Sequence, residues 1–565
     1  MKKEKYKFLF IALLMLMCYS ISALAQSNPH ELFIPPPTGP GQFLDQTILA
    51  DTNSNGTRKD PDRVYVLQRG GEYLVGTFVR NTNWVLRIKA QDGPGKNPII
   101  YLFPNASTGK PPGYFIHVSG DVYLKNLAIS GIVEADPAID PTNYIGGMQG
   151  ALISTNSPGK NIYIDSCLLT NTNGNHVRTD QAPITVKITN SLFTNMGYLG
   201  TSNLGAGKAV DLRAGSCDSL IMINNTFINW QDRIIRHHAS TAPIRYMNFD
   251  HNTLVNGMSY HGLLSLGKTG KEIKITNNLF IDPFALGSDT DAVRQAELTD
   301  HEEKDAFGNP KMVWIYSSPN DTTVFKIANN YYCISTEGQK FLTDNHLSEG
   351  AILTDHIKKK LGADSSKAFK KVSLTLPNVP KLMTTFMTWY RDPNGGNKTK
   401  STTNWSAKYD YDRRTIKYYR DTMNCAYSTT HEAYTGSQGG FPVGDLNWFP
   451  TKKVAWESYV NAVEKLNDGI IPVNYVLDQN YPNPFNPSTT ITYSLPAKST
   501  INLKIYNALG QEVVSLVNNE IQEAGKYKVV WNGKDATGKT MATGVYFYSL
   551  KAEGVNLIKK MLLIK

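Results

Sequence analysis

The sequence predicts an all-β protein in which a solenoid of stacked short strands is followed by a small β-sandwich. First, pairs of apolar residues two positions apart recur every 25 residues or so through the middle of the chain, at about the spacing of known solenoid repeats. Second, a small polar residue, most often Asn, follows each apolar pair by three positions. Third, short alternating strands separated by Gly and Asn occupy the C-terminal part of the chain.

The clearest copies of the repeat lie between Lys208 and Asp282. Each copy has an apolar pair, a small polar residue, a large apolar residue and a final Asn or Asp: Leu220, Met222, Asn225, Phe227 and Asn229; Met247, Phe249, Asn252, Leu254 and Asn256; Ile273, Ile275, Asn278, Phe280 and Asp282. A single short strand cannot bury its apolar face, so the copies are expected to stack as coils. Asn tolerates a left-handed backbone in sharp turns, so Asn225, Asn252 and Asn278 are predicted to form a ladder of side-chain amides at left-handed positions.

The repeats resemble those of the right-handed parallel β-helix proteins of the pectin-lyase-like superfamily. The resemblance covers residues 60 to 335 approximately and implies a right-handed parallel β-helix. It specifies the fold far better than the function, because one fold hosts many activities.

The first 25 residues are predicted to be a secretory signal peptide. Four Lys residues precede an apolar run from Phe8 to Met17, and Ala23-Leu24-Ala25 is a small-residue cleavage site. The run is too short for a membrane anchor, and no transmembrane segment is expected after the signal is removed. Loss of four Lys and one Glu lowers the net charge from +10 to +7. The remaining basic residues are scattered, which argues against nucleic-acid binding.

The mature chain keeps four well-separated cysteines, Cys167, Cys217, Cys333 and Cys425. They form neither a disulfide scaffold nor a CxxC metal site, and Cys167 is expected to be buried in its coil. Insertions at 132–147 and 283–320 are predicted to project as loops. The second holds an acidic run that is either a solvated loop or a calcium-binding loop: Asp289, Asp291, Glu297, Asp300, Glu302 and Glu303.

The repeat is lost after residue 335. A helix is predicted near Thr354 to Leu361, and a second from Trp456 to Leu466 is expected to cap the open end of the stack. The segment Gly440 to Trp448 resembles the tail that closes many secreted bacterial β-helix proteins.

From Asn480 the sequence changes to a Pro-rich turn followed by short strands such as Thr490 to Leu495 and Gly544 to Tyr548. This stretch resembles the type A C-terminal sorting domain of the type IX secretion system. The resemblance implies an immunoglobulin-like β-sandwich, recognition by the secretion machinery, and release from or attachment to the surface of a Gram-negative bacterium. The alternative is an ordinary adhesive sandwich.

The predicted organisation has six parts. They are a signal peptide (1–25), a flexible lead-in (26–63), the parallel β-helix (64–335), an irregular tail and cap (336–469), a linker (470–479) and the C-terminal sorting domain (480–565).

Candidate functional residues lie on the strand that pairs with each repeat. Inward residues form the core of a β-helix, so chemistry must use outward residues of one sheet or nearby loops. Alternation places Val210, Leu212, Ile235 and His237 inward, with His237 a hydrogen-bonded core residue, and Asp211, Arg213, Arg236 and His238 outward. Lys208, Asp232, Arg233 and His261 are expected to join this patch, whereas His251 is expected at the surface in a turn.

The patch has the residue types needed for β-elimination from a uronate. Arg213 and Arg236 could neutralise the sugar carboxylate, and Lys208 or His238 could act as the base. Asp211 and Asp232 could hold Ca²⁺. The competing interpretation is that these charges form cross-strand ion pairs with a structural role.

The characteristic motifs of pectate lyases and polygalacturonases are absent from the chain. The sequence is therefore predicted to encode a secreted or cell-surface monomer that binds or acts on an extracellular, acidic polysaccharide. It leaves open whether the protein is a polysaccharide lyase or a non-catalytic glycan-binding or structural protein.

Overall fold

The computed structural model describes residues 28–39, 41–103, 112–131, 151–172, 174–197, 205–213, 215–237, 242–288, 312–378, 382, 387–388, 423–460, 464–466, 472–536, 539–552 and 554–564. Three parallel sheets wind into a β-helix, and a four-on-four antiparallel β-sandwich follows. The predicted all-β fold class is confirmed.

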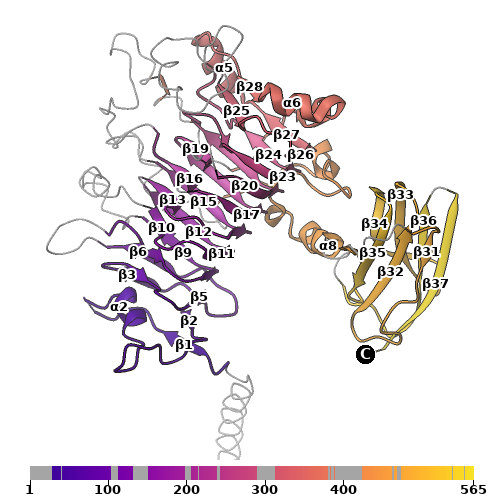
Figure 1. Ribbon diagram of the computed structural model, residues 1–565, viewed down its shortest axis with the longest axis horizontal. Helices are drawn as coiled ribbons and strands as arrows, with labels where there is room; N and C mark the ends of the chain where they lie inside the picture. Colours follow the sequence, from indigo (N-terminus) through magenta and orange to yellow (C-terminus); the bar gives the residue numbers. More distant parts are fainter. Residues whose placement is uncertain are drawn as a thin grey trace, which may run out of the picture.

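We name the three parallel sheets I, II and III, with the strands given below. Each coil contributes one strand to each sheet, and the chain passes from sheet I to sheet III and then to sheet II (Figure 1). Sheet I contains β1 (Glu31–Ile34), β2 (Val64–Leu67), β5 (Leu86–Ala90), β8 (Val122–Lys125), β11 (Asn161–Asp165), β14 (Thr185–Thr189), β17 (Cys217–Ile223), β20 (Ile244–Asp250), β23 (Thr269–Thr276) and β26 (Val324–Ala328). Sheet II contains β4 (Val79–Arg80), β7 (Ile116–Val118), β10 (Ala151–Thr155), β13 (Asn175–Thr179), β16 (Lys208–Leu212), β19 (Arg233–His237), β22 (Leu264–Ser265), β25 (Val313–Tyr316) and β28 (Ala351–Leu353). Sheet III contains β3 (Glu72–Val75), β6 (Ile99–Leu102), β9 (Ala128–Ser130), β12 (Leu168–Thr172), β15 (Leu192–Met196), β18 (Thr226–Trp230), β21 (Thr253–Gly257), β24 (Leu279–Ile281), β27 (Asn330–Cys333) and β29 (Phe369–Lys371).

The apolar pairs of the repeat stack along the axis of the β-helix. Met222 lies opposite Ile188 and Phe249 in neighbouring strands of sheet I, and all three are fully buried. The rings of Phe193, Phe227 and Phe249 form a continuous column, with centroids 5.1 and 6.3 Å apart. Cys167, Cys217, Cys333 and Cys425 are buried.

The predicted asparagine ladder is present between sheets I and III. Asn225, Asn252, Asn278 and Asn330 are joined by amide hydrogen bonds of 2.8–3.0 Å from each Nδ2 to the next Oδ1. The predicted backbone conformation was wrong by one residue, because Asn224, His251 and Asn277 adopt the positive φ. The preceding residue absorbs the turn, and this allows the ladder side chain to point into the stack and bond the main chain.

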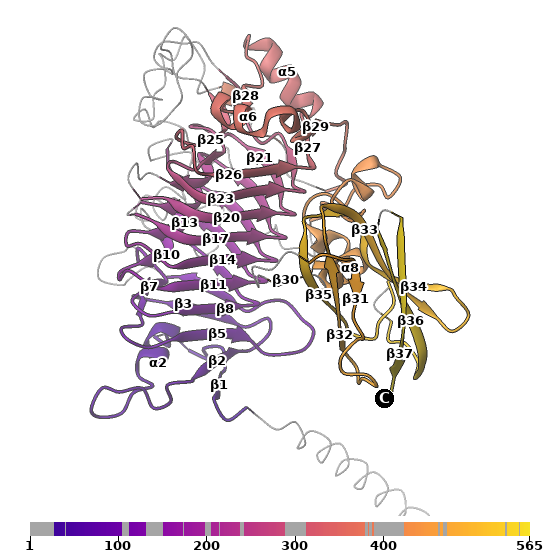
Figure 2. The same cartoon turned by 45° about the vertical axis from the view of Figure 1, so that its right-hand side comes forward.

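Both ends of the β-helix are covered by short helices. At the N-terminal end α2 (Leu44–Leu49) buries Leu44 and Ile48 against the core, and β1 adds a strand to sheet I. The stretch expected to be a flexible lead-in therefore contains regular structure. At the other end lie α5 (Thr336–Asp344) and α6 (Asp355–Leu361), and Ile357 of α6 enters the core (Figure 2). The helix predicted near Thr354 is confirmed as α6.

The helix expected to cap the stack instead lies on its flank. Helix α8 (Pro450–Val460) packs beside the turns between sheets I and III, with the ring of Trp456 5.0 Å from that of His251. His251 is consequently buried, contrary to the surface position expected for it. Helix α6 covers the open end, whereas α8 lies between the β-helix and the sandwich (Figures 1 and 2).

Residues 437–449 form a strap that runs along the turns of successive coils. Gly444 N–H donates to Asn277 O at 2.8 Å, Asp445 N–H donates to Thr253 Oγ1 at 2.8 Å, and Trp448 Nε1–H donates to Thr226 Oγ1 at 2.9 Å. The segment that resembles a β-helix tail thus tethers several coils together. It includes the short 3₁₀ helix η6 (Leu446–Trp448); two others are η1 (Gly362–Lys367) and η5 (Glu432–Thr435).

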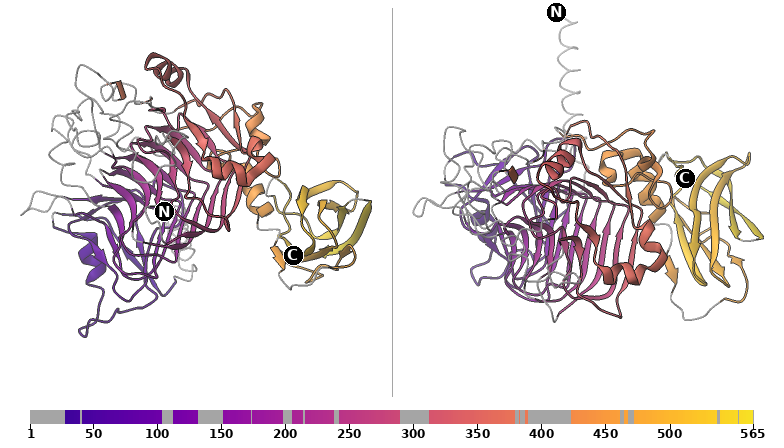
Figure 3. Two further views of the ribbon diagram at one scale, coloured as in Figure 1. Left: turned by 45° about the horizontal axis from the view of Figure 1, so that its top comes forward. Right: turned by 90° about the horizontal axis from the view of Figure 1, so that it is seen from above.

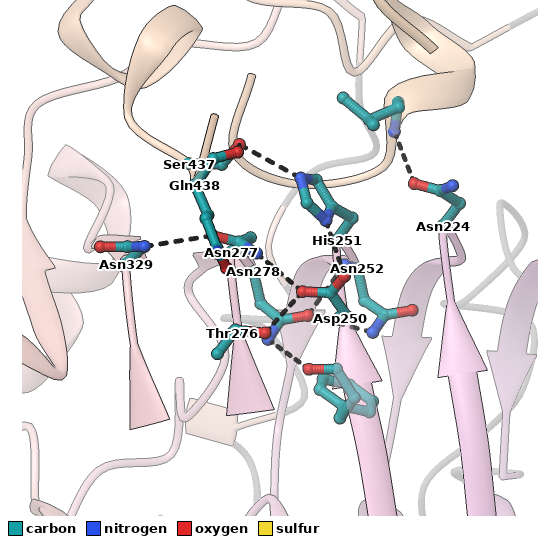
Figure 4. Close-up of polar contacts among 12 residues, drawn as sticks. Asn224, Asp250, His251, Asn252, Thr276, Asn277, Asn278, Asn329, Ser437 and Gln438 are labelled. Carbon is teal, nitrogen blue, oxygen red and sulfur yellow. Dashed lines mark hydrogen bonds and ion pairs between the residues drawn. The ribbon is translucent and has the colours of Figure 1, made fainter. Parts of the chain in front are cut away.

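A buried polar chain anchors the strap to the turn beside the ladder (Figure 4). Asp250 Oδ2 contacts His251 Nδ1 at 3.0 Å, and His251 Nε2 contacts Ser437 Oγ at 3.2 Å. Asp250 Oδ1 also accepts hydrogen bonds from Thr276 and Asn277. All three members of the chain are at most 6% exposed, so this arrangement holds the strap in place.

The C-terminal sandwich lies beside the stack (Figure 3). One sheet contains β30 (Glu464–Leu466), β35 (Gly525–Trp531), β32 (Thr489–Leu495) and β31 (Val476–Leu477); the other contains β34 (Glu512–Gln522), β33 (Ser499–Asn507), β36 (Gly544–Ala552) and β37 (Val555–Leu563). Strands β30 and β31 precede residue 480, so the sandwich recruits backbone from the predicted tail and linker. Glu520 of β34 contacts Gln438 of the strap and Tyr459 of α8.

Candidate functional site

The described residues of the predicted patch gather along sheet II, where β13, β16, β19 and β22 are neighbours. Asp211 is in register with Arg236, and Lys208 is in register with Arg233. Val210 and Ile235 point into the core, as alternation predicted. Asp211 and Arg236 thus share the outer face, whereas Lys208 and Arg233 have the strand parity of the inward residues Val210 and Ile235 and are buried.

Asp232 is the centre of a compact charge cluster. Its Oδ2 lies 2.8 Å from Lys208 Nζ and 3.2 Å from Arg233 Nε, and its Oδ1 lies 2.7 Å from His261 Nδ1. The His261 backbone N–H also donates to Oδ1 at 3.2 Å. Arg233 Nη1–H continues outward to Ser265 Oγ at 2.8 Å. One buried carboxylate thus holds several cationic or donor groups in place.

Asp211 forms a second, smaller contact group. Its Oδ1 lies 3.5 Å from Arg236 Nη1, and its Oδ2 accepts a hydrogen bond from Asn175 Nδ2 at 3.2 Å. Asp211 is 1% exposed, whereas the Arg236 side chain is 15% exposed. Arg236 therefore reaches the surface while Asp211 supports it from beneath.

Burial and neighbouring charges have opposite effects on the pKa values of Asp232 and Lys208. Burial alone would raise the pKa of Asp232, but the charges of Arg233, Lys208 and His261 hold it well below its ordinary value. Burial lowers the pKa of Lys208 and outweighs the attraction of Asp232 and Asp211. Burial therefore shifts the amine of Lys208 toward its neutral form.

The cluster predicts acid sensitivity. Asp232 and Asp250 both have depressed pKa values in the folded protein; for Asp250, burial opposes the shift, and the charge and hydrogen bond of His251 cause it. Their stabilising contribution is present above the unfolded-state value of about 3.9 and is lost as the pH falls below it. We expect the unfolding free energy, measured with urea, to drop between about pH 4 and pH 2. The Asp250→Asn variant should show a shallower drop, and an identical pH profile for both proteins would contradict the assignment.

The predicted site residues differ in accessibility. Arg213 is exposed and Arg236 is partly exposed, whereas Lys208, Asp211 and Asp232 are buried. His237 is the hydrogen-bonded core histidine that was predicted, with contacts of 2.9 Å to Leu266 O and 3.1 Å to Gly215 O. His238 lies outside the described residues, as does the acidic run from Asp289 to Glu303.

Asp211 and Asp232, the two predicted calcium ligands, are both paired with basic side chains. Each carboxylate contacts a basic side chain, and the described part of the chain contains no group of three or more His, Cys, Asp or Glu residues arranged to hold a metal. Positively charged neighbours disfavour a divalent cation. The geometry of these two residues therefore favours the ion-pair interpretation.

The structure extends the patch to residues that the sequence reasoning missed. Along sheet II the register row through Asp211 and Arg236 continues through Arg80, His117, Ser154, Arg178, Ser265 and Tyr316. Ser154 and Ser265 are buried, whereas Arg80, His117, Arg178 and Tyr316 are partly or fully exposed. Arg178 follows inward Val177 by one position, so the same alternation could have placed it on the outer face. Seven strand spacings make the row about 34 Å long.

No helix in the described residues is both long and apolar enough to span a membrane.

One comparison with known proteins concerns the C-terminal sandwich. The family described as FlgD Ig-like domain matches residues 485–556. Two solved structures come from Porphyromonas gingivalis. PorZ, described as an essential bacterial surface component of the type-IX secretion system, matches 15% of this chain and 11% of its own, with 22% identity and a TM-score of 0.12. Dimeric latent PorU matches 18% of this chain and 10% of its own, with 23% identity and a TM-score of 0.14.

The chain thus spans about a tenth of the length of these two solved chains. No curated protein matches the sequence. Nothing about the activity of the β-helix follows from these comparisons.

Proposed function

We propose that this chain is an exported β-helix protein that binds an acidic polysaccharide along the outer face of sheet II. The observation that supports this proposal is the register row that presents Arg80, Arg178 and Arg236 from three different coils. Exposed Arg213 lies directly after β16, beside the same row. A parallel stack repeats its outward side chains at a constant spacing, which suits a polymer that repeats its carboxylates.

Arginine suits this role for a geometric reason. Its planar guanidinium can donate two parallel hydrogen bonds to a carboxylate, and it stays charged at all physiological pH values. Arg236 and Arg178 are held by Asp211 and Asp180, at 3.5 and 2.9 Å. These carboxylates orient the guanidinium groups before the ligand arrives, which reduces the entropy lost on binding.

A second candidate function is β-elimination by a polysaccharide lyase. The lowered pKa of Lys208 favours it, because a general base must be available in its neutral form. Arg213 and Arg236 would neutralise the uronate carboxylate. Lys208 is only 3% exposed, however, and its amine contacts Asp232, so binding is the better-supported function.

The proposal also includes export of the chain by the type IX secretion system. The C-terminal sandwich matches an Ig-like family over residues 485–556, and its sequence resembles a type A sorting domain. The basic and apolar N-terminal segment suits a signal peptide. We infer that residues 480–565 address the chain to the secretion machinery, and that the β-helix works outside the cell or on its outer surface.

Affinity electrophoresis in gels containing polygalacturonate, alginate or chondroitin sulfate tests the binding proposal. The double variant Arg213→Ala/Arg236→Ala is expected to bind the retarding polysaccharide at least tenfold more weakly, since a hydrogen bond to a charged group contributes about 1.5–3 kcal/mol. Arg245→Ala is the matched control, because Arg245 is an exposed residue of sheet I paired with Asp218. Equal retardation of all three proteins would contradict the site.

Release of unsaturated uronate, followed by its ultraviolet absorbance, separates the two candidate functions. Product formation that is lost in Lys208→Met would establish the lyase. Retardation without product would leave the protein a binding module.

A further inference from the structure

Three partly exposed rings and an arginine lie together at the N-terminal end of the register row. They are Phe78, Tyr114, His117 and Arg80, and we name this cluster the aromatic platform. Arg80 ends β4, His117 lies in β7, and their backbones are in register. Arg80 is exposed and the three rings are half-buried, unlike the fully buried phenylalanine column inside the stack.

The rings of the platform hold one another in a defined geometry. Tyr114 and His117 are stacked, with centroids 4.9 Å apart and planes 13° apart. Phe78 meets both rings edge-on, at 6.3 and 5.8 Å. The Arg80 guanidinium lies 5.3 Å from the Phe78 centroid. Such contacts leave few rotamers available, so the platform is ordered before any ligand binds.

The contact between Arg80 and His117 defines the hydrogen-bonding character of the platform. Arg80 Nη2 lies 3.1 Å from His117 Nδ1, and a guanidinium can only donate. Burial and the charge of Arg80 lower the pKa of His117, in keeping with a neutral ring whose Nδ1 accepts this bond. The other ring nitrogen then carries the proton and can donate to a hydroxyl or carboxylate.

We propose that the aromatic platform is a sugar-binding subsite for the same acidic polysaccharide, in which an outer face of the stacked Tyr114–His117 pair packs against one pyranose ring and Arg80 binds a carboxylate. This inference rests on the proposed function. The axial C–H bonds of a pyranose carry partial positive charge and are attracted to the electron-rich face of an aromatic ring. The nearby guanidinium supplies the charge complementarity for a uronate.

The position of the platform fits a chain that follows the stack. From His117 the row passes through Ser154 to Arg178, two strand spacings or about 10 Å away. The row then reaches Asp211 and Arg236. One extended polysaccharide can therefore contact the platform and the arginines of the central coils together.

Calorimetric titration with oligogalacturonates of increasing length tests this subsite in the full-length protein. We expect the affinity of the wild type to rise with oligomer length until the chain spans from Arg236 to the platform. Tyr114→Ala should weaken the binding of long oligomers about tenfold, the loss expected for one aromatic stacking contact, and leave short oligomers unaffected. Arg80→Ala, which keeps all three rings, should also weaken the long oligomers.

Tyr123→Ala is the matched control. Tyr123 is a 40% exposed tyrosine on sheet I, stacked on Tyr163 at 4.6 Å, so its removal reports any general effect of losing a surface ring. Wild-type affinity for long oligomers in Tyr114→Ala, with binding still lost in Arg213→Ala/Arg236→Ala, would overturn the platform alone. Equal losses in Tyr114→Ala and Tyr123→Ala would overturn it too. No binding of any acidic polysaccharide by the wild type would overturn the proposed function and the platform with it.

Discussion

Replacing Asp232 by alanine is expected to destabilise the β-helix by about 3–5 kcal/mol, the largest effect that we anticipate for any single substitution in the charge cluster. Asp232 is fully buried and lies 2.8 Å from Lys208 Nζ and 3.2 Å from Arg233 Nε. Without the carboxylate, two cations that are at most 5% exposed would lack their counter-charge. Urea unfolding of the full-length protein at neutral pH measures the loss.

Asp218→Ala is the control for this experiment. Asp218 also pairs with an arginine, Arg245, but both side chains are about half exposed. An exposed ion pair contributes less than about 1 kcal/mol, so the unfolding free energy should change little. If Asp232→Ala behaved like Asp218→Ala, the cluster would be a solvated surface feature and not a buried network.

Asn252→Ala is expected to cost about 2–4 kcal/mol, because it interrupts the ladder at its centre. The Asn252 Oδ1 accepts from the backbone N–H and the Nδ2 of Asn225, at 3.1 and 3.0 Å. Its Nδ2 donates to Met222 O and to Asn278 Oδ1, at 2.9 and 3.0 Å. Alanine would leave buried donors and acceptors of two neighbouring coils without partners.

The free energy of unfolding, measured with urea, is again the readout, and Asn55→Ala provides the comparison. Asn55 is exposed, and among the described residues its side-chain oxygen accepts hydrogen bonds from Thr57 of its own loop. We expect its removal to cost less than about 1 kcal/mol. A similar small cost for Asn252→Ala would mean that water or a shifted neighbour replaces the ladder bonds.

The repeat made most of the β-helix predictable. Apolar pairs at period two fix which face of each strand is buried, and a polar residue at constant spacing marks the turn. The ladder through Asn225, Asn252 and Asn278 followed from that spacing. The left-handed residue was misplaced by one position, because Asn occupies both turn positions in some coils and His251 occupies the first position in another.

The sequence predicted which residues of the candidate site are neighbours, but not how deeply each of them is buried. Alternation along β16 and β19 brought Asp211 and Arg236 to one face, and the structure places them in register. It did not indicate that Asp232 is buried, because His261, which contacts this carboxylate, comes from about 30 positions further along the chain. The aromatic platform was missed because Phe78 and Tyr114 lie outside the clear copies of the repeat.

Local periodicity by itself determined that this chain forms stacked parallel strands, that asparagines line one corner, and that a separate sandwich follows. Only the tertiary structure decided that α6 covers the open end, that α8 and the strap lie on the flank, and that Arg213 and Arg236 reach solvent while Asp211, on the same face, does not. The physical reason is that a side chain's direction depends on its own backbone, whereas its burial depends on distant segments that pack over it.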